Sequence, residues 1–209
     1  GTGKSNLINM IFNEKIVASS ACAFSVTRKI SFSQGTFELY KNKTVQDVTV
    51  IDTIGLCDSL FTDKEVNSMI ESKVKVNLDH LDKVVVVCSG RIEAVHASAI
   101  KQLLSWLKYQ KHKDRFMFIY NKAEGLNLTQ KAFNLVQMCE MLGVDGPSDI
   151  GVSRDNAAIK MKNVMTTGFP PGADYETIKE DLETFKLGIA YLGNTKPRIP
   201  VEEKTCVIL

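Results

Sequence analysis

Two short segments that contain only apolar residues constrain the fold more than any other feature of this sequence. They are Val84–Cys88, with the letters VVVVC, and Phe116–Tyr120, with the letters FMFIY. A strand without polar alternation is typical of a parallel sheet that is covered on both faces. Segments with helical spacing of apolar residues follow each of them, at 94–109 and 129–142. This alternation predicts an α/β fold, a three-layer α/β/α sandwich with a mainly parallel sheet.

The remaining elements continue the same alternation. We expect a helix at 6–12, β-rich segments at 28–40 and 45–52, a helix at 64–81, a last short strand at 149–152 and a helix at 175–192. Beyond Gly193, polar residues and prolines predict a flexible tail. The 209 residues therefore divide into one domain at 1–192 and a tail at 193–209.

The chain opens with Gly1-Thr2-Gly3-Lys4-Ser5, which matches the end of the phosphate-binding pattern G-x-x-x-x-G-K-[S/T]. The first glycine of that pattern falls three residues before Gly1, so we expect the first strand and the start of the loop to precede this sequence. Small residues let backbone N–H groups point at a phosphate, at the positive end of the helix that follows. In this pattern Lys4 reaches the β- and γ-phosphates and Ser5 ligates Mg²⁺. The predicted nucleotide-binding residues here are Gly1, Thr2, Gly3, Lys4, Ser5 and Asn6.

A second signal lies where the segment 45–52 ends. Asp52 is placed to hold Mg²⁺ through water, and Gly55 follows three residues later, where a bare backbone N–H contacts a γ-phosphate. Thr27 precedes the segment 28–40, at the position of a switch threonine that gives its hydroxyl to Mg²⁺ and its N–H to the γ-phosphate. The predicted metal ligands are therefore Ser5, Thr27 and Asp52, and Thr27 also counts as a catalytic candidate.

The residues Asn121-Lys122-Ala123-Glu124 directly follow the strand 116–120 and resemble the N-K-x-D box that reads guanine. In that box the carboxylate accepts hydrogen bonds from the base, and the lysine stem lies along the ring. Glu124 is one methylene longer than the aspartate of the box, so its carboxylate must shift to accept both bonds. Ser153, after the expected strand 149–152, is a candidate for contact with the other side of the base.

Together these motifs resemble the septin-like P-loop GTPases of the immune-associated nucleotide-binding family (GIMAP, avirulence-induced type), relatives of the chloroplast import receptors. The resemblance covers residues 1–142. It rests on GTGKSNLIN, on the V-T-x-x-x-S-x-S-Q-G run from Val26 to Gly35, on DTIGLCDS and on Ser89-Gly90-Arg91. The sequence departs from the family pattern where Ile54 replaces a proline and where the base box reads NKAE.

The resemblance implies a switch that binds GTP or GDP with Mg²⁺ and forms a homodimer or oligomer through its switch face. Leu56 stands where Ras-type enzymes carry the glutamine that orients the attacking water, which predicts slow GTP hydrolysis. In some members of this family an arginine of the Gly-Arg box crosses the dimer interface, and Arg91 matches that position. An arginine finger accelerates hydrolysis by about 10³–10⁵. The alternative for Arg91 is a surface residue at the start of a helix.

The last four residues, Cys206-Val207-Ile208-Leu209, match a C-a-a-X box whose final leucine predicts geranylgeranylation of Cys206. One lipid chain gives only marginal attachment. We therefore expect reversible attachment to the cytosolic face of a membrane, which dimerisation strengthens by doubling the anchors.

Composition limits the alternatives without removing them. A net charge of +2 argues neither for nucleic acid nor for an acidic substrate, so we expect no nucleic-acid partner. Five cysteines without a C-x-x-C fit reduced thiols in the cytosol. The first alternative is a GTP-loaded scaffold that seldom hydrolyses, which Leu56 favours. The second is a P-loop ATPase or kinase, against which the base box argues. The third is a fragment that binds nothing.

Overall fold

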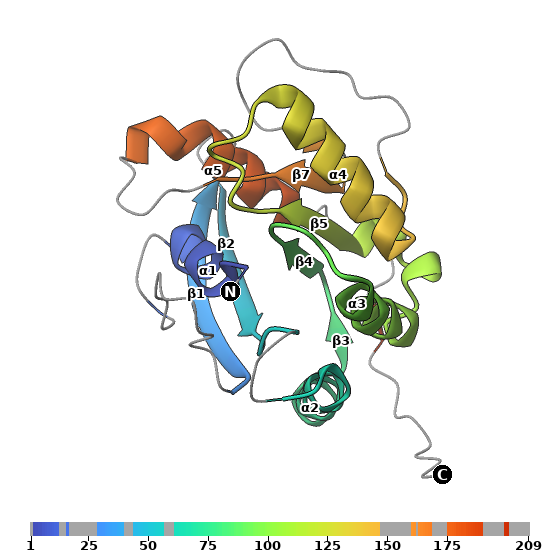
Figure 1. Cartoon of the computed structure of the whole chain (residues 1–209). Helices are drawn as coiled ribbons and strands as arrows, with labels where there is room; N and C mark the ends of the chain where they lie inside the picture. The colour runs from blue at the N-terminus through green and yellow to red at the C-terminus, as the bar shows by residue number, and fades with distance from the viewer. Residues whose placement is uncertain are drawn as a thin grey trace.

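A four-stranded sheet forms the centre of the molecule (Figure 1). The computed structural model describes residues 2–12, 16, 29–39, 44–56, 61–146, 160–161, 163–168, 175–189 and 199–200. The strand order is β4 (Val84–Cys88), β5 (Phe116–Tyr120), β7 (Val164–Thr166) and β6 (Lys160–Met161). β4, β5 and β7 run parallel, and β6 runs antiparallel to β7. The prediction of an α/β fold with a mainly parallel sheet is confirmed.

Helices cover both faces of this sheet, which explains why β5 is apolar throughout. Phe116, Phe118 and Tyr120 point toward α3 (Ala94–Trp106) and α4 (Leu128–Leu142). Met117 and Ile119 point the other way, toward α1 (Lys4–Phe12) and α5 (Tyr175–Ile189). All five side chains of β5 are buried, so each layer of helices packs against alternate residues of the same strand.

The valines of β4 differ from the prediction, because Val84–Val87 are only half-buried. β4 pairs with β5 along one edge, and no other described strand pairs with its second edge. A strand at the edge of a sheet keeps more exposed surface than a central strand. The sequence pattern of a central strand and the outer place of β4 in the described sheet therefore disagree.

A separate hairpin carries the first predicted metal-binding carboxylate. β1 (Ser31–Leu39) pairs antiparallel with β2 (Thr44–Asp52), from Ser31 opposite Asp52 to Leu39 opposite Thr44. The hairpin lies against α1, where a Cβ atom on Gly35 would lie 2.5 Å from the ring of Phe12. Glycine at 35 therefore permits the close approach that brings the end of β2 to the start of α1.

The helix α2 (Asp63–Asn77) is shorter than the helix predicted at 64–81. It begins with a capping box in which the Thr62 side chain accepts a hydrogen bond from the Glu65 amide and Glu65 accepts one from the Thr62 amide. After it, β3 (His80–Leu81) pairs antiparallel with β8 (Ile199–Pro200). Ile199 is 1% exposed, although it lies inside the segment for which the sequence predicts a flexible tail.

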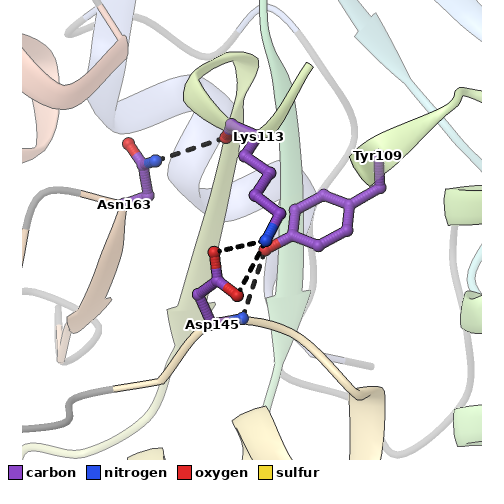
Figure 2. A network of polar contacts seen from close by, with 4 residues as sticks. All are labelled: Tyr109, Lys113, Asp145 and Asn163. Atoms are coloured by element: carbon purple, nitrogen blue, oxygen red, sulfur yellow. Dashed lines mark hydrogen bonds and ion pairs between the residues drawn. The ribbon is translucent and has the colours of Figure 1, made fainter. Parts of the chain in front are cut away.

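The predicted helix 94–109 ends at Trp106, and two 3-10 helices follow, η1 (Tyr109–Lys111) and η2 (Lys113–Arg115). The Lys113 ammonium lies 2.9 Å from the Asp145 carboxylate, and the Asp145 amide donates to the Tyr109 hydroxyl at 3.2 Å (Figure 2). Asn163 Nδ2 donates to the Lys113 carbonyl at 3.2 Å. This network joins the turn before β5 to the end of α4 and to the β6–β7 turn.

The strand predicted at 149–152 lies outside the described residues. On the side of β5 away from β4, the described strand that runs parallel to β5 is β7, whose three residues are all buried. Such a short strand carries no alternation in the sequence, so only its pairing with β5 reveals it. Among the described helices, none has both the length and the apolar character that a membrane crossing requires.

Candidate functional site

The loop segment Thr2–Ser5 leads directly into α1. Gly3 has φ +87°, a conformation that favours glycine, and a Cβ atom there would lie 2.5 Å from Asn121 Nδ2. The Leu7 amide donates to the Gly3 carbonyl at 3.0 Å, so the helix starts immediately after this glycine. Backbone N–H groups at a helix start point out of its end and attract anions. Gly1 itself lies outside the described residues.

Two of the predicted metal ligands lie next to each other. The Ser5 hydroxyl donates a 2.8 Å hydrogen bond to Asp52 Oδ2, which links the start of α1 to the end of β2. Asp52 is 3% exposed. A hydroxyl and a carboxylate are oxygen ligands of the kind that Mg²⁺ prefers, and Mg²⁺ needs only one or two protein ligands beside phosphate and water. The residues present therefore fit this ion.

Gly55 lies beside the predicted phosphate lysine. A Cβ atom on Gly55 would lie 3.3 Å from Lys4 Nζ, so the bare backbone at 55 meets the ammonium closely. The residues on either side hold the loop in place, because Ile54 is 1% exposed and Leu56 packs against two apolar clusters. Leu56 therefore points its side chain into the protein, and it offers no group that could orient a water molecule.

Asn121 connects the phosphate end of the site to the base box. Its Nδ2 donates to the Thr2 carbonyl at 2.8 Å, and its Oδ1 accepts from the Thr167 hydroxyl at 2.9 Å. The Ala123 amide donates to the Thr167 carbonyl at 3.0 Å. Because Asn121 is 4% exposed and both ends of its amide are occupied, it ties three loops together.

Glu124 and Lys122 are both exposed at the surface of the base box. Lys122 has φ +61°, which turns the loop sharply after Asn121. A Cβ atom on Gly168 would lie 2.5 Å from the Glu124 amide nitrogen and 2.7 Å from its Oε2. The loop after β7 therefore approaches Glu124 only because position 168 has no side chain.

Sequence reasoning missed Thr167 and Gly168, which the structure brings against the base box. A threonine and a glycine at the end of a strand are a usable signal, but β7 itself was not predicted. Ser153, which was expected at the corresponding strand end, lies outside the described residues, as do Thr27 and Cys206.

Arg91 is exposed in the loop between β4 and α3. The helix α3 begins after its N-cap residue, Glu93. Asn6 is half-buried in the first turn of α1. Ends of β2, β5 and β7 and the start of α1 thus meet at one edge, where ligands of α/β sheets bind. This arrangement places the start of α1, the oxygen pair of Ser5 and Asp52 and a carboxylate-bearing loop around one edge of the fold.

Comparisons with known proteins agree with this arrangement. The model of a family described as "50S ribosome-binding GTPase" matches residues 1–122. A search of curated proteins found no match. The structure is similar to that of Toc33 from Arabidopsis thaliana in complex with GDP and Mg²⁺, with 14% identity and a TM-score of 0.60 over 97% of this chain and 84% of that chain.

A dimerization-deficient arginine-to-alanine mutant of Toc33 is also similar, with 13% identity and a TM-score of 0.58 over 96% of this chain and 83% of that chain. At these identities the likeness shows a shared fold.

Proposed function

The chain belongs to the GTPase family whose model matches residues 1–122, and from this premise we propose that it is a switch that binds GTP and GDP with Mg²⁺. One observation carries the proposal: the hydrogen-bond chain from Thr2 through Asn121 to Thr167. It ties the phosphate-binding segment to the base box, so both ends of one nucleotide meet prepared partners. Binding at one end therefore benefits from order at the other.

Each residue at the phosphate end has a separate task. Lys4 and the amides at the start of α1 bind the phosphates, and Ser5 and Asp52 hold Mg²⁺. The metal neutralises charge on the phosphate oxygens when it is bound. Gly55 lies against Lys4, and its amide is the donor that we assign to a terminal phosphate.

Hydrolysis of GTP is proposed to be slow. Leu56 packs its side chain against two apolar clusters of the core, where it cannot orient water. Any acceleration then needs a group from outside the site, and the exposed Arg91 is the candidate for supplying it to a second copy.

Competition for a fluorescent guanine nucleotide tests the proposal. GTP and GDP should displace the probe and ATP should not, because the Glu124 carboxylate pairs with donors that adenine lacks. Asp52→Asn should remove the Mg²⁺ dependence of binding, while Asp63→Asn, in the first turn of α2, should leave it intact. Equal displacement by ATP would favour the ATPase or kinase alternative.

Three finer points belong to the same proposal. We assign the chain to the immune-associated type of septin-like GTPase, on the motifs at 1–9, 26–35, 52–59 and 89–91. A homodimer through the switch face and a prenyl anchor at Cys206 complete this picture, with attachment to the cytosolic face of a membrane. Cys206→Ser should abolish partitioning of the cell-made protein into membranes. Unchanged partitioning would contradict the anchor.

A second candidate is a GTP-loaded oligomeric scaffold, which the inward packing of Leu56 favours. Single-turnover hydrolysis measured on monomer and on dimer separates the two. A scaffold shows no turnover in either state, whereas the switch hydrolyses GTP in at least the dimer.

A further inference from the structure

A groove of about 620 Å³ runs between α2 and α3, and none of the predicted nucleotide-binding residues lines it. Asn67 and Glu71 of α2 form one wall, and Trp106 at the end of α3 forms the other. Pro200 of β8 contributes to the lining as well. Its volume lies in the range of sites that hold a small ligand or a few residues of chain.

The groove contains a buried acceptor that has no donor in the described part of the chain. Asn67 is 6% exposed, and its Nδ2 donates to the Ala99 carbonyl at 3.0 Å. Its Oδ1 accepts no hydrogen bond from any described residue. A buried carbonyl oxygen without a donor is unfavourable, so this wall of the groove carries an unmet acceptor.

One segment of the chain begins at the wall of this groove. β8 holds Pro200 against His80 of β3, and the nine residues 201–209, with the letters VEEKTCVIL, follow directly. An extended chain of this length reaches about 30 Å, which is enough to lie along the groove. Its last four residues are apolar, like Trp106 and Leu107 in the groove lining.

Charges on the two partners are complementary. Lys64, Lys108 and Glu71 line the groove and give it a net charge of +1 from these three groups. The segment 201–209 carries Glu202, Glu203 and Lys204 in succession, with a net charge of −1. The groove therefore has more basic than acidic groups, and the segment 201–209 has more acidic than basic groups.

We propose that, in the protein whose Cys206 carries no lipid, the groove between α2 and α3 is the docking site of residues 201–209 of the same chain, and that Trp106 couples its occupancy to the loop around Gly55. Trp106 and Leu103 pack in the same apolar cluster as Ile54 and Leu56, the two neighbours of Gly55. A segment that presses on Trp106 therefore biases the loop that contacts Lys4. This coupling rests on the proposed nucleotide site. It is reciprocal: a bound nucleotide changes the docking equilibrium by the same factor by which docking changes the affinity for that nucleotide.

Cross-linking in the full-length protein tests the docking, with the protein made without lipid so that Cys206 is a free thiol. Ser68→Cys and Ser105→Cys each place a thiol on the exposed lining of the groove. A disulfide forms only when the two Cα atoms come within about 7 Å. Thr129→Cys, on the exposed side of α4, is the matched control outside the groove.

We expect the link from Cys206 to position 68 or 105 to form on the order of tenfold faster than the link to position 129, because docking raises the local concentration. Peptide mapping identifies the pair, and Cys206→Ser should remove the product. Burial raises the pKa of Cys139 to about 11, so this thiol stays unreactive at neutral pH. Equal rates at 68, 105 and 129 would overturn the docking.

Trp106 provides a second measurement, because it is the only tryptophan of the sequence. The double substitution Val207→Asp with Ile208→Asp should increase acrylamide quenching of its fluorescence and shift the emission to longer wavelength. Unchanged quenching would mean that residues 207 and 208 do not cover Trp106. That result would refute the proposal, whatever else binds in the groove.

The nucleotide arm separates docking from the proposed function. GDP and a non-hydrolysable GTP analogue, each with Mg²⁺, should give different cross-linking rates at position 68 or 105. If both nucleotides bind and the cross-linking rates with the two are identical, the coupling is refuted. Failure of either nucleotide to bind would instead refute the proposed function, while the cross-linking result without nucleotide still decides the docking.

Discussion

Gly168 determines how closely the loop after β7 approaches the base box. A Cβ atom there would lie within 2.7 Å of Glu124 Oε2 and closer still to the Glu124 amide nitrogen. Protein interiors tolerate no such overlap, so any side chain at 168 must displace Glu124. The bare backbone leaves room for a carboxylate that is one methylene longer than aspartate.

The substitution Gly168→Ala is expected to weaken GDP binding by about 1–3 kcal/mol, the usual cost of forcing extra atoms into a packed site. Titration calorimetry with GDP measures the change. Gly125→Ala, next to Glu124 in the base-box loop, is the control, because a Cβ atom at 125 meets no atom within 4 Å. If Gly168→Ala binds GDP as tightly as this control does, Gly168 has no part in positioning Glu124.

At the scale of elements, the two 3-10 helices before β5 bury groups that lie in a run rich in charged residues, 108–115. Tyr109, His112 and Arg115 are all buried. Burial lowers the pKa of His112, and the positive charges of Lys111, Lys108 and Arg115 lower it further. His112 Nε2 has no hydrogen-bond partner among the described residues, so the folded protein holds this ring neutral at neutral pH.

The stability of the protein should therefore depend on pH through His112. The unfolded chain protonates this histidine near pH 6.5, and the folded chain does so only at lower pH. The contribution to the free energy of unfolding is complete above pH 6.5 and decreases as the pH falls toward the folded pKa, by at most about 1.36 kcal/mol per pH unit. Urea unfolding above and below pH 6.5 measures the slope. The substitution His112→Asn should reduce this slope, and the control His96→Asn should not. Equal slopes in the wild type and in His112→Asn would contradict the assignment to His112.

At the scale of the whole molecule, residues near the end of the sequence complete the core. Ile199 packs in the same apolar cluster as Phe116 and Leu104, far from it in sequence. Pairing of β8 with β3 brings it there. The folded unit of the described structure thus includes Ile199 and Pro200, beyond the boundary expected at 192.

Ile199→Ala is expected to lower the free energy of unfolding by about 2–5 kcal/mol, because it removes methyl groups from a buried site and leaves a cavity. Thermal or urea unfolding measures the loss. Val76→Ala is the control, since Val76 is 81% exposed and its truncation should change the stability by less than about 0.5 kcal/mol. Similar effects of the two substitutions would show that β8 contributes nothing to the core.

Association of two whole molecules is the scale at which Arg91 is proposed to act as an arginine finger. GTP turnover per molecule should then rise with protein concentration, and Arg91→Ala should remove that rise, a loss of about 10³ or more at saturation. Lys101→Ala, at an exposed position on α3, serves as the control for a lost surface charge. Turnover that is independent of concentration in the wild type would leave Arg91 as a surface residue at the start of α3.

Local chemistry was readable without the fold. The loop segment Thr2–Ser5, Asp52 and Asn121 could be named from their spacing, because phosphate, metal and base each require specific atoms after a strand or before a helix. The apolar run of β5 likewise predicted a strand that is covered on both faces. In these places the local residue pattern follows directly from what surrounds the residues in the fold.

Other features exist only through contacts between distant residues. β7 is too short to show a period, and Thr167 and Gly168 gain their meaning from Asn121 and Glu124 across the sheet. The buried state of His112 and Arg115 depends on turns that a run of charged letters does not indicate. The sequence by itself determined the α/β class and named the candidate residues of the loops, since these follow from short-range patterns. The tertiary structure alone decided which loops meet, because such pairing arises when packing brings together residues that no local pattern relates.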